Sequence, residues 1–572
     1  MNNFLYVTVH IGYMGSIYYV ERNGQKYAYE SVSRRVPGKK NPVTKKTYLG
    51  KVDPDTGKII PKESKKVPSE EHVRKYGCMK VLDKVQSDLG IMDDLCECFP
   101  DIAENIMATA MAVAIDPTPF DDVHFTVDEN GLKDWLKLRG NLSPTVLSDM
   151  TKDLGQRLSA MDMFFTHRVS RMDDNDSYSM DITSNSTHSD MGGYAEWGYN
   201  RDGEDLPQTE ILLVTDSKGI PIAFQMLPGS ISDSSTLDGT VEWMTALGIK
   251  GRLVADRGFE NARNISSLLD RGIRFTIPSN AREMPIKKLM TKAIPLMKDS
   301  DSIRRHEGRT YRVVEFEVGV ADLEDGARYV TKLNPNEKNA ESENTLFEAS
   351  RRIRAFVVLD PRKAADDMDT LMSAIEDAEL RLEGTKRKNP DKEFEKLPAF
   401  VRSHLEWSVD DEGIMHVSRL QNSFSFDSNR AGMFVMFTSE GTDWEEMMSS
   451  YDTRDWVEKA FDVYKTDVDG SRSRTGDPDR ARARFFIKML ALIMRIHIQN
   501  TLRDHEQEIL STKAKKDNVC GLTVSGMMRT LGTLMVIVSP GYTRLTPPSK
   551  TVREIFSLFG LEEPVAGKIT LS

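Results

Sequence analysis

The segment between Ser177 and Pro278 constrains the fold of this chain most strongly. It holds three runs with the β-branched and apolar composition of strands, which are Ser177–Ser184, Glu210–Thr215 and Ile220–Met226. The last two runs flank the turn Asp216–Gly219, a combination that predicts a β-hairpin. The segment therefore begins as a small antiparallel sheet.

After the hairpin the pattern changes to helices and buried strands. A helical run with Leu237, Val241 and Leu247 leads to the apolar strand Arg252–Ala255, and a further helix and strand end at Pro278. Three antiparallel strands followed by a helix and a strand are the element order of an RNase H-like sheet. We therefore predict a mixed α/β fold with an RNase H-like core.

Two aspartates occupy the ends of predicted strands in this segment. Asp181 follows the run Ser177–Met180 and is itself followed by hydroxyl residues, while Asp256 follows Arg252–Ala255 directly. An aspartate at a strand end is more often a turn former or a helix cap than a functional group. Neither residue alone indicates a site, which would need a third acid at a matching place in the fold.

The stretch from Tyr451 to Lys465 supplies that acid. It contains no glycine or proline and follows two serines, so we predict a helix. On a helical wheel four polar side chains fall within about 60° of one another, beside an apolar stripe; they are Tyr451, Arg454, Glu458 and Lys465. A solvated helix face with one salt bridge is the simpler interpretation of such a pattern.

The spacing Tyr-x2-Arg-x3-Glu-x6-Lys resembles the YREK signature of one group of DDE transposases, the enzymes of bacterial and archaeal insertion sequences. The resemblance extends to four short upstream phrases, which are Asp181–Ser184, Gly219–Pro221, Leu227–Ser230 and Ala255–Phe259. It implies that Asp181, Asp256 and Glu458 are the catalytic metal ligands. It also implies that Tyr451, Arg454 and Lys465 bind DNA phosphates at the transposon end.

Three carboxylates suit two divalent metal ions. Hard oxygen ligands favour Mg²⁺ or Mn²⁺, and the sequence around these residues holds no cluster of histidine and cysteine that would favour zinc. Two such ions about 3.5–4 Å apart can activate a water or a 3′-hydroxyl and stabilise the leaving oxygen of a phosphodiester.

The resemblance implies cut-and-paste transposition, with nicking at the element end and strand transfer by the freed 3′-hydroxyl. The partners would be double-stranded DNA, both the inverted-repeat ends and the target, and a second copy of the chain in a homodimeric complex. Two alternatives stay open at this point. One is an RNase H-like nuclease without strand transfer, and the other is a non-catalytic DNA-binding descendant of a transposase.

With 572 residues the chain is too long for a single hydrophobic core. We predict six regions, which are a small basic β region (1–70), a helical region that binds the DNA ends (71–160), the first part of the RNase H-like core (161–280), a largely β insertion domain (281–440), the second part of the core with the glutamate helix (441–535), and a tail with a short helix (536–572).

The net charge of −11 disfavours DNA binding as a whole-chain sum, but local basic patches exist. Eleven cations follow one another in the first region, where a phosphate-binding surface and a solvated basic loop remain alternatives; they are Arg34, Arg35, Lys39, Lys40, Lys45, Lys46, Lys51, Lys58, Lys62, Lys65 and Lys66. A second group, Arg472 to Arg484, either lies near bound DNA or begins a solvated helix.

No apolar run reaches the ~20 residues of a membrane span, and we read Phe4–Tyr19 as strands rather than as a signal peptide. The four cysteines are too few and too irregularly spaced for a disulfide framework or a zinc ribbon, so we expect reduced, structural thiols. We expect a cytoplasmic protein that associates with the nucleoid and not with the membrane.

Overall fold

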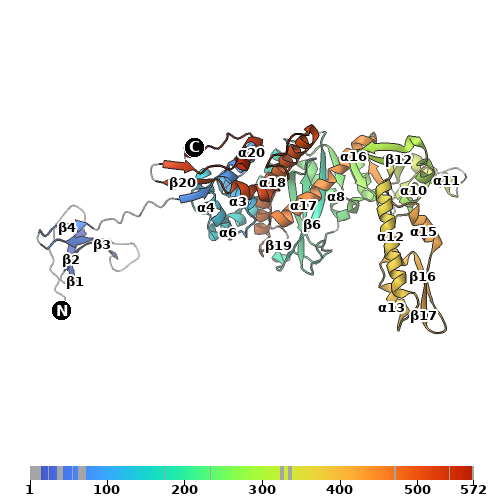
Figure 1. The fold of residues 1–572 in the computed structure, drawn as a ribbon, viewed down its shortest axis with the longest axis horizontal. Helices are drawn as coiled ribbons and strands as arrows, with labels where there is room; N and C mark the ends of the chain where they lie inside the picture. The colour runs from blue at the N-terminus through green and yellow to red at the C-terminus, as the bar shows by residue number, and fades with distance from the viewer. Residues whose placement is uncertain are drawn as a thin grey trace. The chain divides into compact units, whose positions relative to one another are not determined.

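A computed structural model describes most of the chain (Figure 1). The described residues are 15–22, 25–34, 43–54, 56–61, 72–173, 175–231, 233–281, 283–321, 328–332, 336, 338–468, 470, 472–539 and 542–569. The chain divides into two compact units. The first comprises residues 1–73, 536–545 and 567–572, and the second comprises residues 74–535 and 546–566.

The first unit contains an antiparallel sheet whose strands pair in chain order. They are β1 (Gly15–Arg22), β2 (Gln25–Arg34), β3 (Val43–Val52) and β4 (Ile59–Pro61). The described residues of this stretch therefore form mainly strands. The predicted strand Tyr6–Val9 lies outside the described residues, as do six of the basic residues, Arg35, Lys39, Lys40, Lys62, Lys65 and Lys66.

Three further strands near the C-terminus pair antiparallel in chain order. They are β20 (Met535–Ser539), β21 (Tyr542–Leu545) and β22 (Gly567–Ile569). The predicted short helix between them is α20 (Lys550–Leu558).

The second unit begins, after β5 (His72–Lys75), with a helical layer. Its helices are α1 (Gly77–Asp88), α2 (Ile91–Cys98), α3 (Ala103–Ile115), α4 (Val123–Glu129), α5 (Leu132–Trp135), α6 (Pro144–Gln156) and α7 (Leu158–Val169). Helix α3 is apolar on nearly all sides and is buried accordingly. It packs with α6 against the long helix α18 (Pro478–Thr512). Residues 77–169 are thus mainly helical.

A large mixed sheet forms the centre of the second unit, in the order β11-β12-β14-β18-β10-β9-β6-β7-β8. Its strands are β6 (Ser177–Thr187), β7 (Gln208–Thr215), β8 (Pro221–Pro228), β9 (Arg252–Ala255), β10 (Arg274–Pro278), β11 (Ile303–His306), β12 (Arg309–Ala321), β14 (Arg351–Leu359) and β18 (Met433–Thr438). Two further strands pair with this sheet: β13 (Arg328–Val330) pairs with β12, and β19 (Arg472–Ser473) pairs with β6. The predicted hairpin at Asp216–Gly219 is confirmed, since β7 and β8 pair antiparallel.

The sheet continues into the segment that follows Pro278. Strand β18 pairs antiparallel with both β10 and β14, so strands predicted for an insertion extend the central sheet itself. Sequence separation hid this pairing, because about 150 residues lie between β10 and β18. The predicted mixed α/β class is confirmed by this sheet and its helices.

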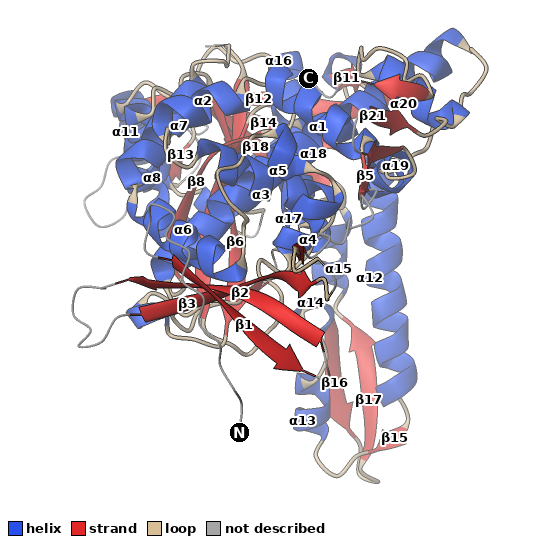
Figure 2. Cartoon of the chain, turned by 90° about the vertical axis from the view of Figure 1, so that its left-hand side faces the viewer, coloured by secondary structure: helices blue, strands red, loops and turns tan. Residues whose placement is uncertain are grey.

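One part of that segment forms its own small core. Helix α12 (Pro361–Leu382) lies beside the hairpin β16 (Leu405–Val409) and β17 (Ile414–Arg419), as Figure 2 shows, and β15 (Thr385–Lys386) pairs with β17. Ile375, Leu382 and Met415 are fully buried between these elements. The short helices α13 (Pro390–Glu395) and α14 (Ala399–Arg402) complete it.

The remaining helices of the second unit cover the sheet or connect its strands. They are α8 (Asp233–Ala246), α9 (Ala262–Asp270), α10 (Met284–Leu296), α11 (Ala340–Ala349), α15 (Gln421–Ser428), α16 (Trp444–Asp452), α17 (Arg454–Asp467) and α19 (Val524–Leu531). Within the described part of the chain, every helix is too short or too polar to cross a membrane.

The predicted helix Tyr451–Lys465 is divided in two at Thr453. Tyr451 belongs to the end of α16, whereas Arg454 begins α17. The Thr453 hydroxyl donates to the Ser450 carbonyl at 2.6 Å and pairs with the Ser179 hydroxyl at 3.0 Å. Side-chain hydrogen bonds of this kind compete with the regular backbone pattern. The helical wheel drawn from the sequence placed Tyr451 and Arg454 on one helix, whereas they belong to two.

Candidate active site

Asp181 and Asp256 come from neighbouring positions of two parallel strands. Strands β6 and β9 pair in register up to Met180 and Ala255, so Asp181 and Asp256 are the next positions along the two chains. Adjacent strands lie about 4.8 Å apart. Asp181 was expected at a strand end, but β6 continues to Thr187 because it pairs with β7 as far as Ser186. Asp256 does follow the last residue of β9.

Helix α17 runs along β6, on the face of the strand that carries Asp181. Two hydrogen bonds fix this placement: Ser179 pairs with Thr453 at 3.0 Å, and Asn185 donates to the Tyr464 hydroxyl at 3.0 Å. Ser179, Asp181 and Asn185 share one face, because side chains alternate along a strand.

These two hydrogen bonds place Glu458 at the level of Asp181. The Ser179–Thr453 hydrogen bond is the common starting point. Glu458 lies five residues beyond Thr453, about 7.5 Å along the helix. Asp181 lies two residues beyond Ser179, about 6.6 Å along the strand. The Glu458 side chain is 49% exposed, so it lies at the edge of the helix and not beneath it.

Arg454 bridges the second aspartate and the glutamate. Its Nη2 lies 3.1 Å from Asp256 Oδ1 and donates to Glu458 Oε1 at 2.5 Å, and its Nη1 donates to the Tyr451 hydroxyl at 3.3 Å. Burial alone would lower the pKa of Arg454, but Asp256, Tyr451 and Glu458 together raise it above its ordinary value. The guanidinium is therefore permanently charged and ties α17 to the end of β9.

A family comparison decides what this arrangement belongs to. The model described as the transposase DDE domain matches residues 174–494, a span that contains Asp181, Asp256 and Glu458. The chain belongs to this family. No curated protein matches the chain.

The ligand chemistry of the transposase domain fits divalent cations. The three side chains offer only carboxylate oxygens, the donors that Mg²⁺ and Mn²⁺ prefer. Their oxygens do not all lie within 4.8 Å of one another, and the Arg454 guanidinium contacts two of the three. Among the described residues, closer groups of metal-ligating side chains occur elsewhere, as His306, Glu307 and Asp452 and as His505, Asp517 and Cys520.

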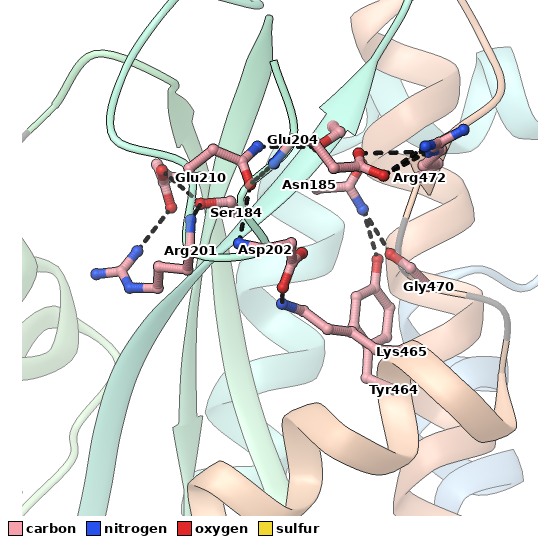
Figure 3. Close-up of polar contacts among 12 residues, drawn as sticks. Ser184, Asn185, Arg201, Asp202, Glu204, Glu210, Tyr464, Lys465, Gly470 and Arg472 are labelled. Atoms are coloured by element: carbon pink, nitrogen blue, oxygen red, sulfur yellow. Dashed lines mark hydrogen bonds and ion pairs between the residues drawn. The ribbon is translucent and has the colours of Figure 1, made fainter. Parts of the chain in front are cut away.

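Lys465 lies away from the carboxylates. It is seven residues beyond Glu458, about 10.5 Å along the helix, and its Nζ contacts Asp202 Oδ1 at 2.5 Å (Figure 3). Tyr451 and Arg454 contact each other, so the four residues of the predicted edge divide into one group at the carboxylates and one cation at a separate loop.

A buried polar network holds that loop. Glu210 is 3% exposed and accepts hydrogen bonds from Ser184 at 3.2 Å and from Arg201 at 3.1 Å (Figure 3). Asn185 also donates to the Gly470 carbonyl at 2.8 Å, which fixes the chain after α17. Sequence reasoning missed these supporting residues. The available signal was the run of polar side chains inside β6, where Ser184, Asn185 and Ser186 are all buried.

Helix α16 is held on the sheet by a second set of polar contacts. Arg252 is buried and donates to the Phe275 carbonyl, to Thr442 and to Glu446. The Thr276 and Ser450 hydroxyls pair at 3.0 Å. These contacts fix the junction between α16 and α17, from which Tyr451 and Arg454 project.

The arginines downstream of α17 contact protein groups of the transposase domain and of the helical layer. Arg472 pairs with Glu204, Arg480 donates to the Ser148 carbonyl at 3.2 Å, and Arg482 donates to the Gly155 carbonyl at 2.9 Å. Arg484 lies over the Phe120 ring. These contacts differ from the solvated helix start that was one alternative, because the arginines bind protein groups and secure the start of α18.

Proposed function

We propose that this chain is a cut-and-paste transposase that cleaves the ends of an insertion sequence and joins them to target DNA. Its catalytic core is RNase H-like, and an insertion domain at about residues 281–440 interrupts it in sequence while adding strands to the same sheet. The observation that carries the proposal is how Asp181, Asp256 and Glu458 are positioned. Two of them are adjacent in the β6–β9 register, and Arg454 links the second to the third.

In this proposal Asp181, Asp256 and Glu458 hold two Mg²⁺ or Mn²⁺ ions. When bound, the ions supply the charge that activates a water or 3′-hydroxyl and stabilises the leaving oxygen. The chain's own residues position the site: Asp181 is fixed by the strand, and Glu458 is fixed by the hydrogen bonds at Thr453 and Tyr464.

Arg454, Tyr451 and Lys465 contact phosphates of the element end in the proposed complex. Arg454 is best suited to this role, because a guanidinium can bind a phosphate through two parallel hydrogen bonds while remaining fully charged. Lys465 exchanges its contact with Asp202 for a phosphate when DNA binds. The ion pair with Asp202 keeps the ammonium group oriented beforehand.

The remaining regions serve DNA binding and assembly. The helical region 71–160 binds the element ends, and two copies of the chain act together on a pair of ends. Target DNA is the third partner. The protein works in the cytoplasm, associated with the nucleoid.

A reaction with the purified full chain tests the proposal. Duplex DNA that carries the inverted repeats flanking the element is incubated with Mg²⁺ and a supercoiled target plasmid. Joined products support a transposase. Cleaved but unjoined ends indicate a nuclease of the same fold, and a mobility shift without cleavage indicates a DNA-binding protein that has lost catalysis.

A further inference from the structure

The sheet of the first unit has one face with cations and no acids. Side chains of directly paired residues point to the same side of a sheet. In the register of β1, β2 and β3, the pairs Tyr18 with Tyr29 and Tyr29 with Tyr48 define that face. Arg22, Lys46 and Lys51 lie on it at other positions of the same register, and among the described strand positions it carries no acid.

The opposite face of the same strands mixes cations with acids. Its register positions hold Lys26, Arg34 and Lys45, but also Glu21 and Glu30, and Lys26 is directly paired with Glu21. One face therefore has three cations and no acid, and the other has three cations and two acids. Both faces belong to the same strands, and the difference between them lies in the acids.

Tyrosines and small hydroxyl residues hold most of the other positions of this cationic face, which we call the tyrosine face. The rings of Tyr18 and Tyr29 stack at 5.5 Å, and those of Tyr29 and Tyr48 lie 5.2 Å apart. Tyr27 joins them at 6.2 Å from Tyr48, and the hydroxyls of Ser33 and Thr44 pair at 2.8 Å on the same side. Because the rings cover one another, the groups available to a ligand are mainly hydroxyls and cations.

The Tyr48 hydroxyl keeps its proton and can donate a hydrogen bond. Partial burial, together with the neighbouring phenols of Tyr27 and Tyr29, raises the pKa of Tyr48 above its ordinary value. The group therefore stays protonated at neutral pH. Lysine, arginine, serine, threonine and tyrosine are the side chains that contact DNA phosphates most often, and such contacts fix a duplex without reading its sequence.

We propose that the tyrosine face of β1–β3 binds the phosphate backbone of duplex DNA. This inference rests on the proposed function for the identity of its ligand. Tyr18 and Tyr29 stack on each other, and this reduces the ring surface that unpaired bases could use, so a duplex is favoured over a single strand. The face adds affinity that does not depend on sequence, and it lies in a different unit of the chain from the carboxylates.

Two double variants with equal charge loss test the proposal in the full chain. Lys46→Ala/Lys51→Ala removes two cations from the tyrosine face, whereas Lys26→Ala/Lys45→Ala removes two from the opposite face. All four lysines are exposed. Binding of a duplex of unrelated sequence is measured by fluorescence anisotropy in EDTA at several salt concentrations.

The first variant is expected to reduce the slope of log K against log salt by about 1.8, because each lost phosphate contact removes about 0.9. The second is expected to leave the slope within about 0.5 of wild type. Tyr18→Phe/Tyr29→Phe keeps the rings and is expected to lower affinity several-fold with an unchanged slope, because a hydroxyl carries no charge.

Equal slopes for the two lysine variants, or tighter binding of single-stranded than of duplex DNA, would overturn the inference. An unchanged affinity of the tyrosine variant would overturn its hydroxyl contacts. None of these results touches the proposed function, which fails separately if the wild-type chain neither cleaves nor joins element ends in Mg²⁺.

Discussion

Replacing Arg454 separates the charge of the guanidinium from its ability to bridge. One nitrogen contacts Asp256 at 3.1 Å and Glu458 at 2.5 Å, while another donates to Tyr451 at 3.3 Å. A lysine ammonium keeps the charge but cannot hold the same planar set of partners. Arg454→Lys therefore removes the bridge alone, and Arg454→Ala removes both bridge and charge.

The geometry sets the size of the effect. Loss of one hydrogen bond to a charged group costs about 1.5–3 kcal/mol, and about 1.4 kcal/mol corresponds to a tenfold change in rate. Arg454→Lys is expected to slow single-turnover cleavage of an element-end duplex by about 10- to 100-fold, with the salt slope of DNA binding unchanged. Arg454→Ala is expected to slow cleavage at least as much and to reduce the slope by about 0.9.

Cleavage is followed with end-labelled duplex in Mg²⁺, and binding by anisotropy in EDTA. Lys459→Ala is the matched control, since Lys459 is a cation of the same helix that lies over the Trp456 ring. It should leave cleavage unaltered. Wild-type cleavage by Arg454→Lys would refute the bridging role, and an unchanged salt slope in Arg454→Ala would refute the phosphate contact.

Four other outcomes are expected. Asp181→Ala, Asp256→Ala and Glu458→Ala should each abolish cleavage and retain end binding in a gel-shift assay, and residual cleavage by any one would remove that residue from the site. Cleavage should require Mg²⁺ or Mn²⁺ and fail with Ca²⁺ alone, which accepts looser coordination; activity in EDTA would contradict this. Tyr464→Phe removes the hydroxyl that accepts from Asn185, so we expect a lower melting temperature, consistent with about 1 kcal/mol, and slower cleavage at unchanged DNA affinity. Lys465→Ala should flatten the salt dependence of end binding by about 0.9, whereas a purely structural pairing with Asp202 would change only the melting temperature.

Local patterns predicted the elements of the central sheet well. The hairpin at Asp216–Gly219, the strand before Asp256 and the helix that carries Glu458 each follow from composition and spacing over a few residues. Such signals are local, so a single sequence carries them. The same holds for α12, whose charged outer face and buried Ile375 and Leu382 repeat at helical spacing.

Contacts between distant segments could not be predicted from the sequence. Nothing local indicates that β18 pairs with β10, or that the Thr453 hydroxyl meets Ser179 and divides the predicted helix. The partner of Lys465 is likewise a residue 263 positions away, so wheel arithmetic could not show the contact of the ammonium with Asp202. Register and side-chain pairing are properties of the assembled sheet.

Iron-directed backbone cleavage tests the central claim most directly. Fe²⁺ replaces Mg²⁺ at carboxylate sites and, with ascorbate and peroxide, generates radicals that cut the nearest backbone. We predict cuts beside Asp181, Asp256 and Glu458 in the complex with element-end DNA, suppressed by excess Mg²⁺ and lost in Asp181→Asn. Cuts confined to the cluster of His306, Glu307 and Asp452, or to that of His505, Asp517 and Cys520, would contradict the assignment of the metal site.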